Sequence, residues 1–205
     1  MGDRKYASPR LGVFGGTFDP PHVGHLIVAA ELRHALRLDR VLFVPAGCPP
    51  HKPQPLSDDA DRLAMVRLAI EGDPAFAVST VDVDRGGPSY SVDLLTILRA
   101  EHPAATLVFL MGEDSLRDFP SWRRPGTIAT IAELGVASRP GVVADLAAVE
   151  RAVPETAGRI VLVPTPSIGV SSRDLRRRVV SGATIAHQVP MAVERYIHNR
   201  GLYQK

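Results

Sequence analysis

The stretch GVFGGTFDPPHVGHLIVAAELRHAL, which runs from Gly12 to Leu36, decides the fold. The apolar run 11–14 at its start predicts a buried strand, and the apolar spacing across 23–36 predicts a helix. Between them the glycines at 15 and 16 leave the backbone open to close approach by a ligand, and two prolines stiffen the turn. A helix that begins directly after such a turn presents free N–H groups and the positive end of its dipole. The turn therefore predicts an anion site.

Strand-like and helix-like segments alternate along the rest of the chain. Apolar runs rich in β-branched residues predict strands near 11–14, 40–45, 76–83, 106–111, 133–137 and 159–163. Helical patterns occupy the segments near 23–36, 58–71, 91–101, 116–132 and 143–153, and two more helices near 173–181 and 190–199 close the chain. The alternation predicts an α/β fold with a doubly wound, mainly parallel sheet and C-terminal helices. Ligands of such a fold bind beyond the carboxyl ends of the strands.

Composition is that of an ordinary globular protein. The 205 residues suit one domain, which we expect over 11–205, with residues 1–10 as a frayed terminus. A formal net charge of +2 gives no reason to expect nucleic acid or a membrane as a partner. One cysteine, Cys48, excludes an internal disulfide framework and a cysteine-rich zinc site. Without a signal core or a membrane-spanning run we expect a cytoplasmic protein, and the sequence leaves open whether it forms a homo-oligomer.

His22 and His25 stand at the start of the first helix, three residues apart, so both can face one ligand. The turn before them fits neither the G-x-G-x-x-G fingerprint nor a phosphate-binding loop ending in Gly-Lys-Ser/Thr, which disfavours a dehydrogenase. A zinc site needs a third ligand, and no nearby candidate has a recognisable spacing, so we expect no protein-bound metal. Two interpretations stay open: the imidazoles cap and pack the helix, or they donate hydrogen bonds to phosphate oxygens. Phosphate chemistry explains more, because the pair flanks Gly24 beside a glycine-rich turn.

The segment GGTFDPPHVGH resembles the signature Gly-Thr-Phe-Asp-x-x-His-x-Gly-His of a nucleotidyltransferase superfamily. That superfamily carries a second signature of Ser-Ser-Thr-x-x-Arg type near its C-terminus. Here Ser171 and Ser172 are followed by Arg173, where the superfamily has Thr, and then by Arg176. The same stretch also matches a helix N-terminus, with Ser171 as N-cap and Asp174 three residues later. The two interpretations are compatible, because a capped N-terminus keeps N–H groups for phosphate.

Middle and C-terminal segments narrow the resemblance. GPSYS at 87–91, MGEDS at 111–115, FPSW at 119–122 and YIHNRGLY at 196–203 are similar to those of bacterial nicotinate mononucleotide adenylyltransferases. The resemblance covers 11–203, nearly the whole chain. It implies a Rossmann-like nucleotidyltransferase fold, ATP and nicotinate mononucleotide as small-molecule substrates, and Mg²⁺ as the cofactor that accompanies ATP.

The resemblance also implies which residues bind ATP. His22 and His25 would contact the ATP phosphates, and Arg176 would hold the triphosphate from the opposite side. These three are the predicted catalytic residues. The other residues expected in the ATP site are Gly15, Gly16, Thr17, Phe18, Gly24, Gly112, Asp114, Ser171 and Ser172.

On the acceptor side, the resemblance implies that Trp122 stacks on the pyridine ring of nicotinate mononucleotide. Ser91, where the family has Thr, and the amide N–H of Arg123 would share the nicotinate carboxylate. His51 and Lys52, in a proline-rich loop, would close over substrate and phosphate. Two alternatives remain: another nucleotidyltransferase of this superfamily, such as phosphopantetheine adenylyltransferase, and a non-catalytic nucleotide-binding module.

Overall fold

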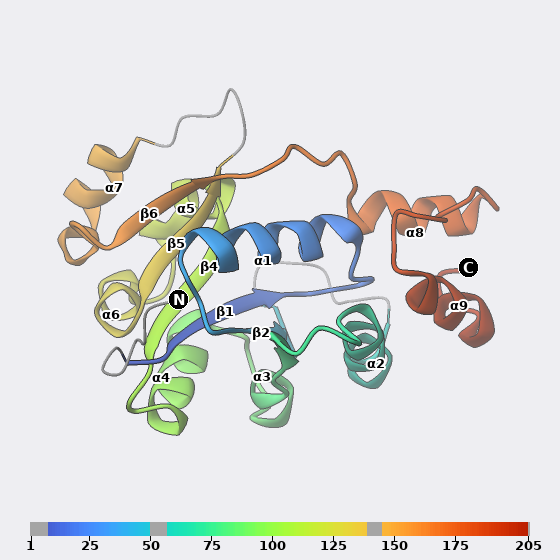
Figure 1. The fold of residues 1–205 in the computed structure, drawn as a ribbon, viewed down its shortest axis with the longest axis horizontal. Coiled ribbons are helices and arrows are strands. Elements are labelled where there is room, and N and C mark those ends of the chain that lie inside the picture. Colours follow the sequence, from blue (N-terminus) through green and yellow to red (C-terminus); the bar gives the residue numbers. More distant parts are fainter. Residues whose placement is uncertain (1–7, 50–56, 139–144, 205) are drawn as a thin grey trace, which may run out of the picture.

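The computed structural model describes residues 8–49, 57–138 and 145–204. Its centre is a six-stranded sheet (Figure 1). All five neighbouring strand pairs are parallel. In spatial order the strands are β3 (Phe76–Val78), β2 (Arg40–Pro45), β1 (Arg10–Gly16), β4 (Thr106–Gly112), β5 (Glu133–Ser138) and β6 (Ile160–Pro164). The chain builds one half outward from β1 and the other outward from β4, so the order reverses between these central strands. The predicted doubly wound α/β fold is confirmed.

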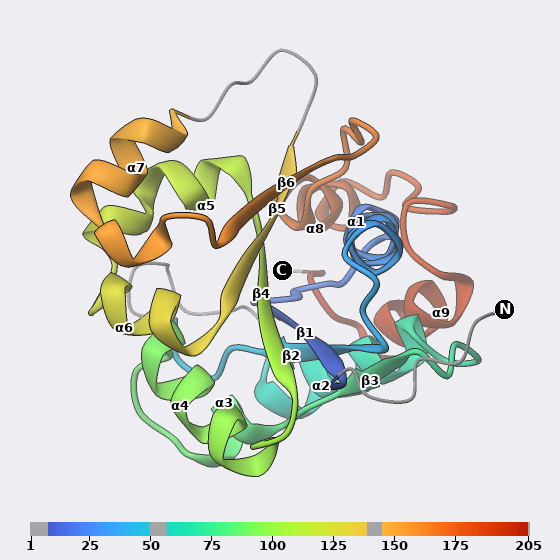
Figure 2. The same cartoon turned by 60° about the vertical axis from the view of Figure 1, so that its left-hand side comes forward.

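Helices cover both faces of the sheet (Figure 2). The helices on one face include α1 (Val23–Ala35) and α2 (Asp59–Ala69), and those on the other include α4 (Ser91–Glu101), α6 (Pro125–Ile131) and α7 (Leu146–Ala152). Each face has its own hydrophobic core. Alternate residues of β4 supply the two cores, with Leu107 and Phe109 in one and Val108 and Leu110 in the other. A strand buried on both faces needs this uninterrupted apolar run, which is the pattern seen in the sequence.

The two C-terminal helices lie beyond the edge of these layers. The helices α8 (Ser172–Val180) and α9 (Met191–Arg200) pack with α2 around a third cluster, which includes Met65, Leu175 and Ile197. Both views place α8 beside the N-terminal end of α1 (Figures 1 and 2). The packing therefore brings the end of the chain to the glycine-rich turn. In the described part of the chain, none of the helices has both the length and the apolar character needed to cross a membrane.

The strand predicted over 76–83 is wrong in its second half. β3 ends at Val78, and the short helix α3 occupies Val81–Asp84. The valines at 81 and 83 have the alternation of a strand. However, Asp82 and Asp84 fall in the first turn of the helix, where acidic side chains are favourable. The backbone N–H of Val83 then bonds the carbonyl of Thr80 at 2.9 Å, which closes that turn.

The single helix predicted over 116–132 is also wrong. It is three elements: α5 (Glu113–Asp118), a 3₁₀ turn η1 (Phe119–Ser121) and α6, which begins at Pro125. Prolines at 120 and 125 have no N–H to donate, so a continuous helix would lose hydrogen bonds at both. Arg124 has a left-handed backbone with φ 52°, which ends the turn and starts a new helix direction. The break leaves Trp122 in a loop.

Two boundaries also differ. β1 begins at Arg10, one residue before the expected start, because its N–H donates to the Asp39 carboxylate at 2.7 Å and its guanidinium pairs with Glu133 at 2.7 Å. Residue 10 is therefore held in the sheet and is not frayed. The helix expected over 143–153 starts at Leu146, where the Asp145 carboxylate accepts the N–H of Ala148 at 2.9 Å. Residues 1–7, 143 and 144 lie outside the described residues, and a single domain over 11–205 stays a prediction.

The packing of Leu36, at the end of α1, against β5 makes a testable prediction. A Cβ added at Gly135, in β5, would lie 2.5 Å from Leu36 Cδ1 and 2.9 Å from Leu110 Cδ2. We expect Gly135→Ala to lower the free energy of unfolding by about 1–3 kcal/mol, because those side chains must leave their rotamers. Urea unfolding measures the change. Gly169→Ala is the matched control, since a Cβ there meets nothing within 4 Å, and an equal effect of the two substitutions would contradict the packing argument.

Candidate active site

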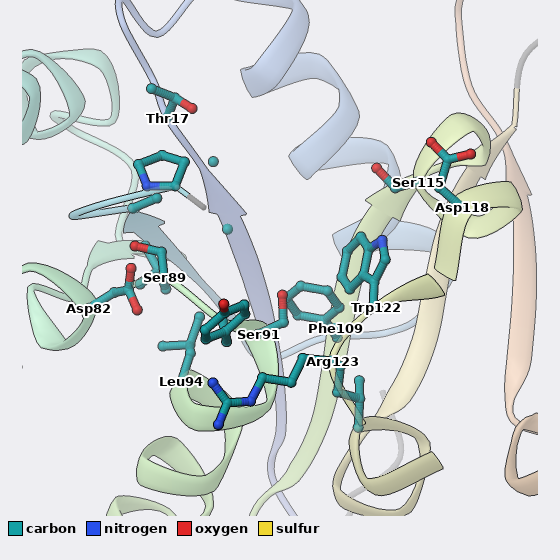
Figure 3. Close-up of a pocket in the computed structure, with 17 residues that line it drawn as sticks. Thr17, Asp82, Ser89, Ser91, Leu94, Phe109, Ser115, Asp118, Trp122 and Arg123 are labelled. Carbon is teal, nitrogen blue, oxygen red and sulfur yellow. The ribbon is translucent and has the colours of Figure 1, made fainter. Parts of the chain in front are cut away.

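Two cavities, each of about 360 Å³, lie on either side of the carboxyl end of β1. The first, here the Trp122 cavity, is lined by Gly15, Gly16, Thr17, Ser91, Trp122 and Arg123 among others (Figure 3). The second, here the histidine cavity, is lined by Phe14, Gly24, His22, His25, Ser171 and Ser172 together with neighbouring loop residues. β1 thus ends between them. Of the residues predicted for ATP, His22, Gly24, His25, Gly112, Ser171 and Ser172 line the histidine cavity, whereas Gly15, Gly16 and Thr17 line the Trp122 cavity. Ser91, Trp122 and Arg123, predicted for the acceptor, also line the Trp122 cavity, and both cavities lie at the switch point of the sheet.

The two histidines lie against each other at the start of α1. Their ring centroids are 3.7 Å apart with the planes inclined by 27°. The Nδ1 atom of His25 accepts the backbone N–H of His22 at 3.2 Å. A nitrogen that accepts a hydrogen bond carries no proton, so neutral His25 has its proton on Nε2 and can donate from there. His25 therefore helps cap the helix and keeps a donor, which makes the two sequence interpretations compatible.

His22 is neutral because it is buried. His22 is only 8% exposed, and this burial lowers the pKa of its imidazole from 6.5 to about 4. Within the described residues its Nδ1 is buried without a hydrogen-bond partner. Gly24 permits this placement, since a Cβ there would lie 3.0 Å from that Nδ1 atom. The orphaned nitrogen is a polar atom that a ligand in the histidine cavity could satisfy.

The N-terminus of α8 closes the histidine cavity from the far end of the sequence. Ser171 is its N-cap, and the Ser171 hydroxyl accepts the N–H of Asp174 at 3.2 Å, as predicted. The Ser172 hydroxyl donates to the carbonyl of Pro20 at 2.8 Å, and Arg176 Nη1 donates to the carbonyl of Asp19 at 2.6 Å. These bonds attach α8 to the turn before α1.

The neighbouring arginines of α8 face elsewhere. Arg177 and Arg178 both pair with the Asp174 carboxylate, and the Arg177 side chain is 81% exposed. Arg173, at the position where the superfamily has Thr, is exposed. Arg176 is the arginine of this helix that turns toward the glycine-rich turn.

A buried arginine of α2 holds the glycine-rich turn through a hydrogen bond to its backbone. Arg62 of α2 has no exposed surface, donates to the carbonyl of Thr17 at 2.9 Å and pairs with Asp59. Phe18, predicted to line the ATP cleft, is 2% exposed and packs edge-on against the His25 ring with centroids 5.0 Å apart. Phe18 thus lies beneath the histidine pair, outside the lining of either cavity.

The Trp122 cavity has an aromatic wall and a polar wall. The indole of Trp122 packs edge-on against Phe109 at 6.1 Å between centroids. Ser91 is the first residue of α4, and the guanidinium of Arg123 lies 4.5 Å from the centroid of the Tyr90 ring. Figure 3 shows Trp122 on one side of the cavity, across from Ser91. A flat apolar surface with hydroxyl groups opposite it suits an aromatic ring that carries a polar substituent.

Sequence reasoning missed Asp82 as a lining residue. Its buried carboxylate accepts the backbone N–H of Gly47 at 3.1 Å and the Arg85 guanidinium at 2.9 Å. Ser89 similarly accepts the N–H of Cys48 at 2.9 Å. Together they fix the loop after β2 as one wall of the cavity. The prediction of a strand over 76–83 gave no reason to single out Asp82. The position of Asp82 shortly before the GPSYS motif was the available signal.

Comparison with known proteins identifies the family. Residues 13–178 match the family model described as cytidylyltransferase-like. A protein of Thermomicrobium roseum named "Probable nicotinate-nucleotide adenylyltransferase" is 57% identical over 196 residues, which cover 95% of this chain and 92% of that one. The chain belongs to the nicotinate-nucleotide adenylyltransferase family. A protein of the same name from Thermus thermophilus is 41% identical, over 95% of this chain and all of the other. Members of this family are nucleotidyltransferases.

Solved structures carry the same fold. The nicotinic acid mononucleotide adenylyltransferase of Plasmodium falciparum, solved with APC and with NaAD, superposes with a TM-score of 0.76 at 18% identity. The match covers 95% of this chain and 97% of the other. The Rossmann-like nucleotidyltransferase fold expected from the sequence is confirmed.

Among the described residues expected from the family resemblance, Phe18, Asp114 and Arg176 line neither cavity. The Asp114 side chain is 73% exposed and lies 3.5 Å from Arg117, whereas Gly112, two residues earlier, lines the histidine cavity. His51 and Lys52 lie outside the described residues. Their assignments stay predictions.

Carboxylates and histidines do not gather into a metal cage in the regions described. None of these residues forms a group of three or more His, Cys, Asp or Glu that could hold an ion. Mg²⁺ fits such a site when ATP phosphates and water supply its ligands.

The buried histidine makes a prediction about pH. Between pH 6.5 and about 4 the unfolded chain protonates His22 and the folded chain does not, so stability falls as the pH falls through this window. The full loss for this group is about 3 kcal/mol, and it levels off below pH 4. Urea unfolding at several pH values should show this loss in the wild type and a smaller one in His22→Gln. His34→Asn, at an exposed position of the same helix, should keep the wild-type profile. Parallel profiles for the wild type and His22→Gln would contradict the assignment.

Proposed function

We propose that the protein transfers AMP from ATP to nicotinate mononucleotide, giving nicotinate adenine dinucleotide and pyrophosphate, in the biosynthesis of NAD. The observation that carries the proposal is the pair of cavities on either side of the β1 end, one with a histidine pair and one with a tryptophan wall. Two ligands bound there would meet at the Gly15–Thr17 turn. The names of the relatives agree with this reaction.

In this proposal the histidine cavity binds the ATP triphosphate. The N-termini of α1 and α8 both point their free N–H groups toward this cavity, and the positive ends of both helix dipoles face it. His25 donates from Nε2, and His22 presents a neutral ring with an unpartnered nitrogen. Arg176 supplies a permanent positive charge at the turn, because a guanidinium does not deprotonate. Gly112 and the two α8 serines complete the wall.

The Trp122 cavity binds the acceptor. The indole stacks on the pyridine ring, while the Ser91 hydroxyl and the backbone N–H of Arg123 donate to the nicotinate carboxylate. Both groups are donors, and an ionised carboxylate only accepts hydrogen bonds. These two donors therefore favour nicotinate mononucleotide over its amide. The indole surface does not discriminate, because it can stack on any similar ring.

The chemistry requires positioning and charge stabilisation. An oxygen of the acceptor phosphate attacks the α-phosphorus of ATP in line, the bond to the pyrophosphate oxygen breaks, and pyrophosphate leaves. The attacking group is already an anion, so no general base and no covalent enzyme intermediate are needed. What opposes the reaction is the approach of two anions and the charge that grows on the leaving oxygen. The histidine donors, Arg176 and two helix N-termini face that charge. Bound to the triphosphate, Mg²⁺ supplies further neutralisation.

Two rivals are less well supported. Phosphopantetheine adenylyltransferase shares the first signature, but it does not account for the Trp122 cavity with its Ser91 wall. A non-catalytic nucleotide-binding module does not account for the retention of His22, His25 and Arg176 together.

The choice of acceptor tests the proposed reaction. Pyrophosphate release should be measured with ATP, Mg²⁺ and either nicotinate mononucleotide or its amide. An amide NH₂ placed against a donor leaves both groups unsatisfied at about 1–3 kcal/mol each, so kcat/KM should favour the acid by roughly tenfold to a few hundredfold. Ser91→Ala should narrow this ratio, and Trp122→Ala should weaken both acceptors alike. Equal use of acid and amide by the wild type would refute the carboxylate site.

The histidine pair has its own test. His25→Ala should lower kcat by roughly 10²-fold or more, as the loss of a donor to the transition state does. His34→Ala, at an exposed position of the same helix, should keep wild-type turnover. Circular dichroism establishes that both variants are folded. Near-normal turnover in folded His25→Ala would remove His25 from the mechanism.

A further inference from the structure

The C-terminal Tyr203 reaches the turn that precedes α1. It follows α9, is 8% exposed and packs with Met65 and Ile197 in the third hydrophobic cluster. Its hydroxyl donates to Asp19 Oδ1 at 2.6 Å and accepts the Ser57 hydroxyl at 2.9 Å. A side chain at the end of the chain thus bonds a carboxylate within the sequence GGTFDPPH.

That carboxylate lies beside the arginine proposed to hold ATP. Asp19 is 2% exposed, and its Oδ2 is 3.9 Å from Arg176 Nη1. The same Nη1 donates to the Asp19 backbone carbonyl at 2.6 Å. At 3.9 Å the two groups form a long ion pair. A small rotation of the carboxylate would shorten it into a hydrogen-bonded ion pair, which is stronger away from water. An arginine neutralised in this way attracts a triphosphate less.

We propose that Tyr203 is a positioning residue, which keeps the Asp19–Arg176 ion pair long and so leaves the guanidinium available to the ATP triphosphate. The 2.6 Å bond holds the Oδ1 oxygen of Asp19, which limits rotation of the carboxylate toward the guanidinium. Burial and the neighbouring Asp19 charge raise the pKa of Tyr203, so its hydroxyl keeps the proton that it donates. The inference rests on the proposed function, because it assumes that Arg176 binds ATP.

Tyr203→Phe tests the role of the hydroxyl. The phenylalanine ring keeps the packing of the third cluster, and only the hydrogen bonds are lost. We expect the Kd for a non-hydrolysable ATP analogue and the KM for ATP to rise about tenfold, as loss of a charge-assisted hydrogen bond predicts. The KM for nicotinate mononucleotide should not change, because its proposed cavity lies on the other side of β1.

Tyr196→Phe is the matched control. Tyr196 of α9 donates to the Asp61 carboxylate at 2.7 Å, so its loss removes a tyrosine–aspartate bond in the same region without touching Asp19. It should leave ATP affinity unchanged. If both variants weakened ATP binding equally, or if neither did, the proposal for Tyr203 would fall.

A double-mutant cycle separates positioning from a structural role. In an Asp19→Asn background the charge that competes for Arg176 is gone, so Tyr203→Phe should change ATP affinity by less than twofold. A full tenfold effect in that background would overturn the inference. The binding assay also distinguishes its failure from failure of the proposed function. A wild type that binds the ATP analogue but releases no pyrophosphate with nicotinate mononucleotide would refute the reaction, while a Tyr203 effect on binding that requires the Asp19 charge would still support the inference.

Discussion

Two hydrogen bonds that join distant parts of the chain organise this molecule: those from Ser172 and Arg176 to the backbone carbonyls of Pro20 and Asp19. They hold the N-terminus of α8 against the turn that starts α1. Each helix alone would have free N–H groups facing water, which binds anions weakly. Brought together, the two N-termini direct their free N–H groups toward one cavity, which needs no high net charge of the whole chain. The third hydrophobic cluster, in which α8 and α9 pack with α2, supports this contact.

Much of this arrangement could be predicted from local signals. The period of the apolar residues distinguishes strands from helices in most segments, and the two glycine- and serine-containing signatures mark where the helices begin. Sequence pattern failed where a tertiary contact or a proline overrode it. Val81 and Val83 alternate as in a strand, yet they belong to a short helix beside β2. The segment 116–132 is periodic enough for one helix, but Pro120, Pro125 and the left-handed Arg124 divide it.

The site shows the same division. His22, His25, Ser171 and Ser172 were predicted from the two signature motifs, and the structure brings them together around the histidine cavity, while their roles stay predictions. Asp82 was not found, because its role depends on accepting the N–H of Gly47, 35 residues earlier in the sequence. Phe18 was assigned to ligand contact because it belongs to the signature, whereas the structure gives it a packing role under His25. A motif identifies the neighbourhood of a site more reliably than it distinguishes the residues that touch ligand from those that support them.

The long sequence separation between the two halves of the histidine cavity has a consequence for synthesis in the cell. The turn at Asp19 and Pro20 leaves the ribosome early, but α8 is made about 150 residues later. Until then the positive ends of α1 and α8 cannot converge, and the nascent chain lacks the cavity that would bind nucleotide. A ligand that binds only the assembled cavity adds its binding free energy to the finished fold and none to earlier intermediates. In the proposed function, ATP would therefore stabilise completed molecules selectively and leave truncated ones without this protection.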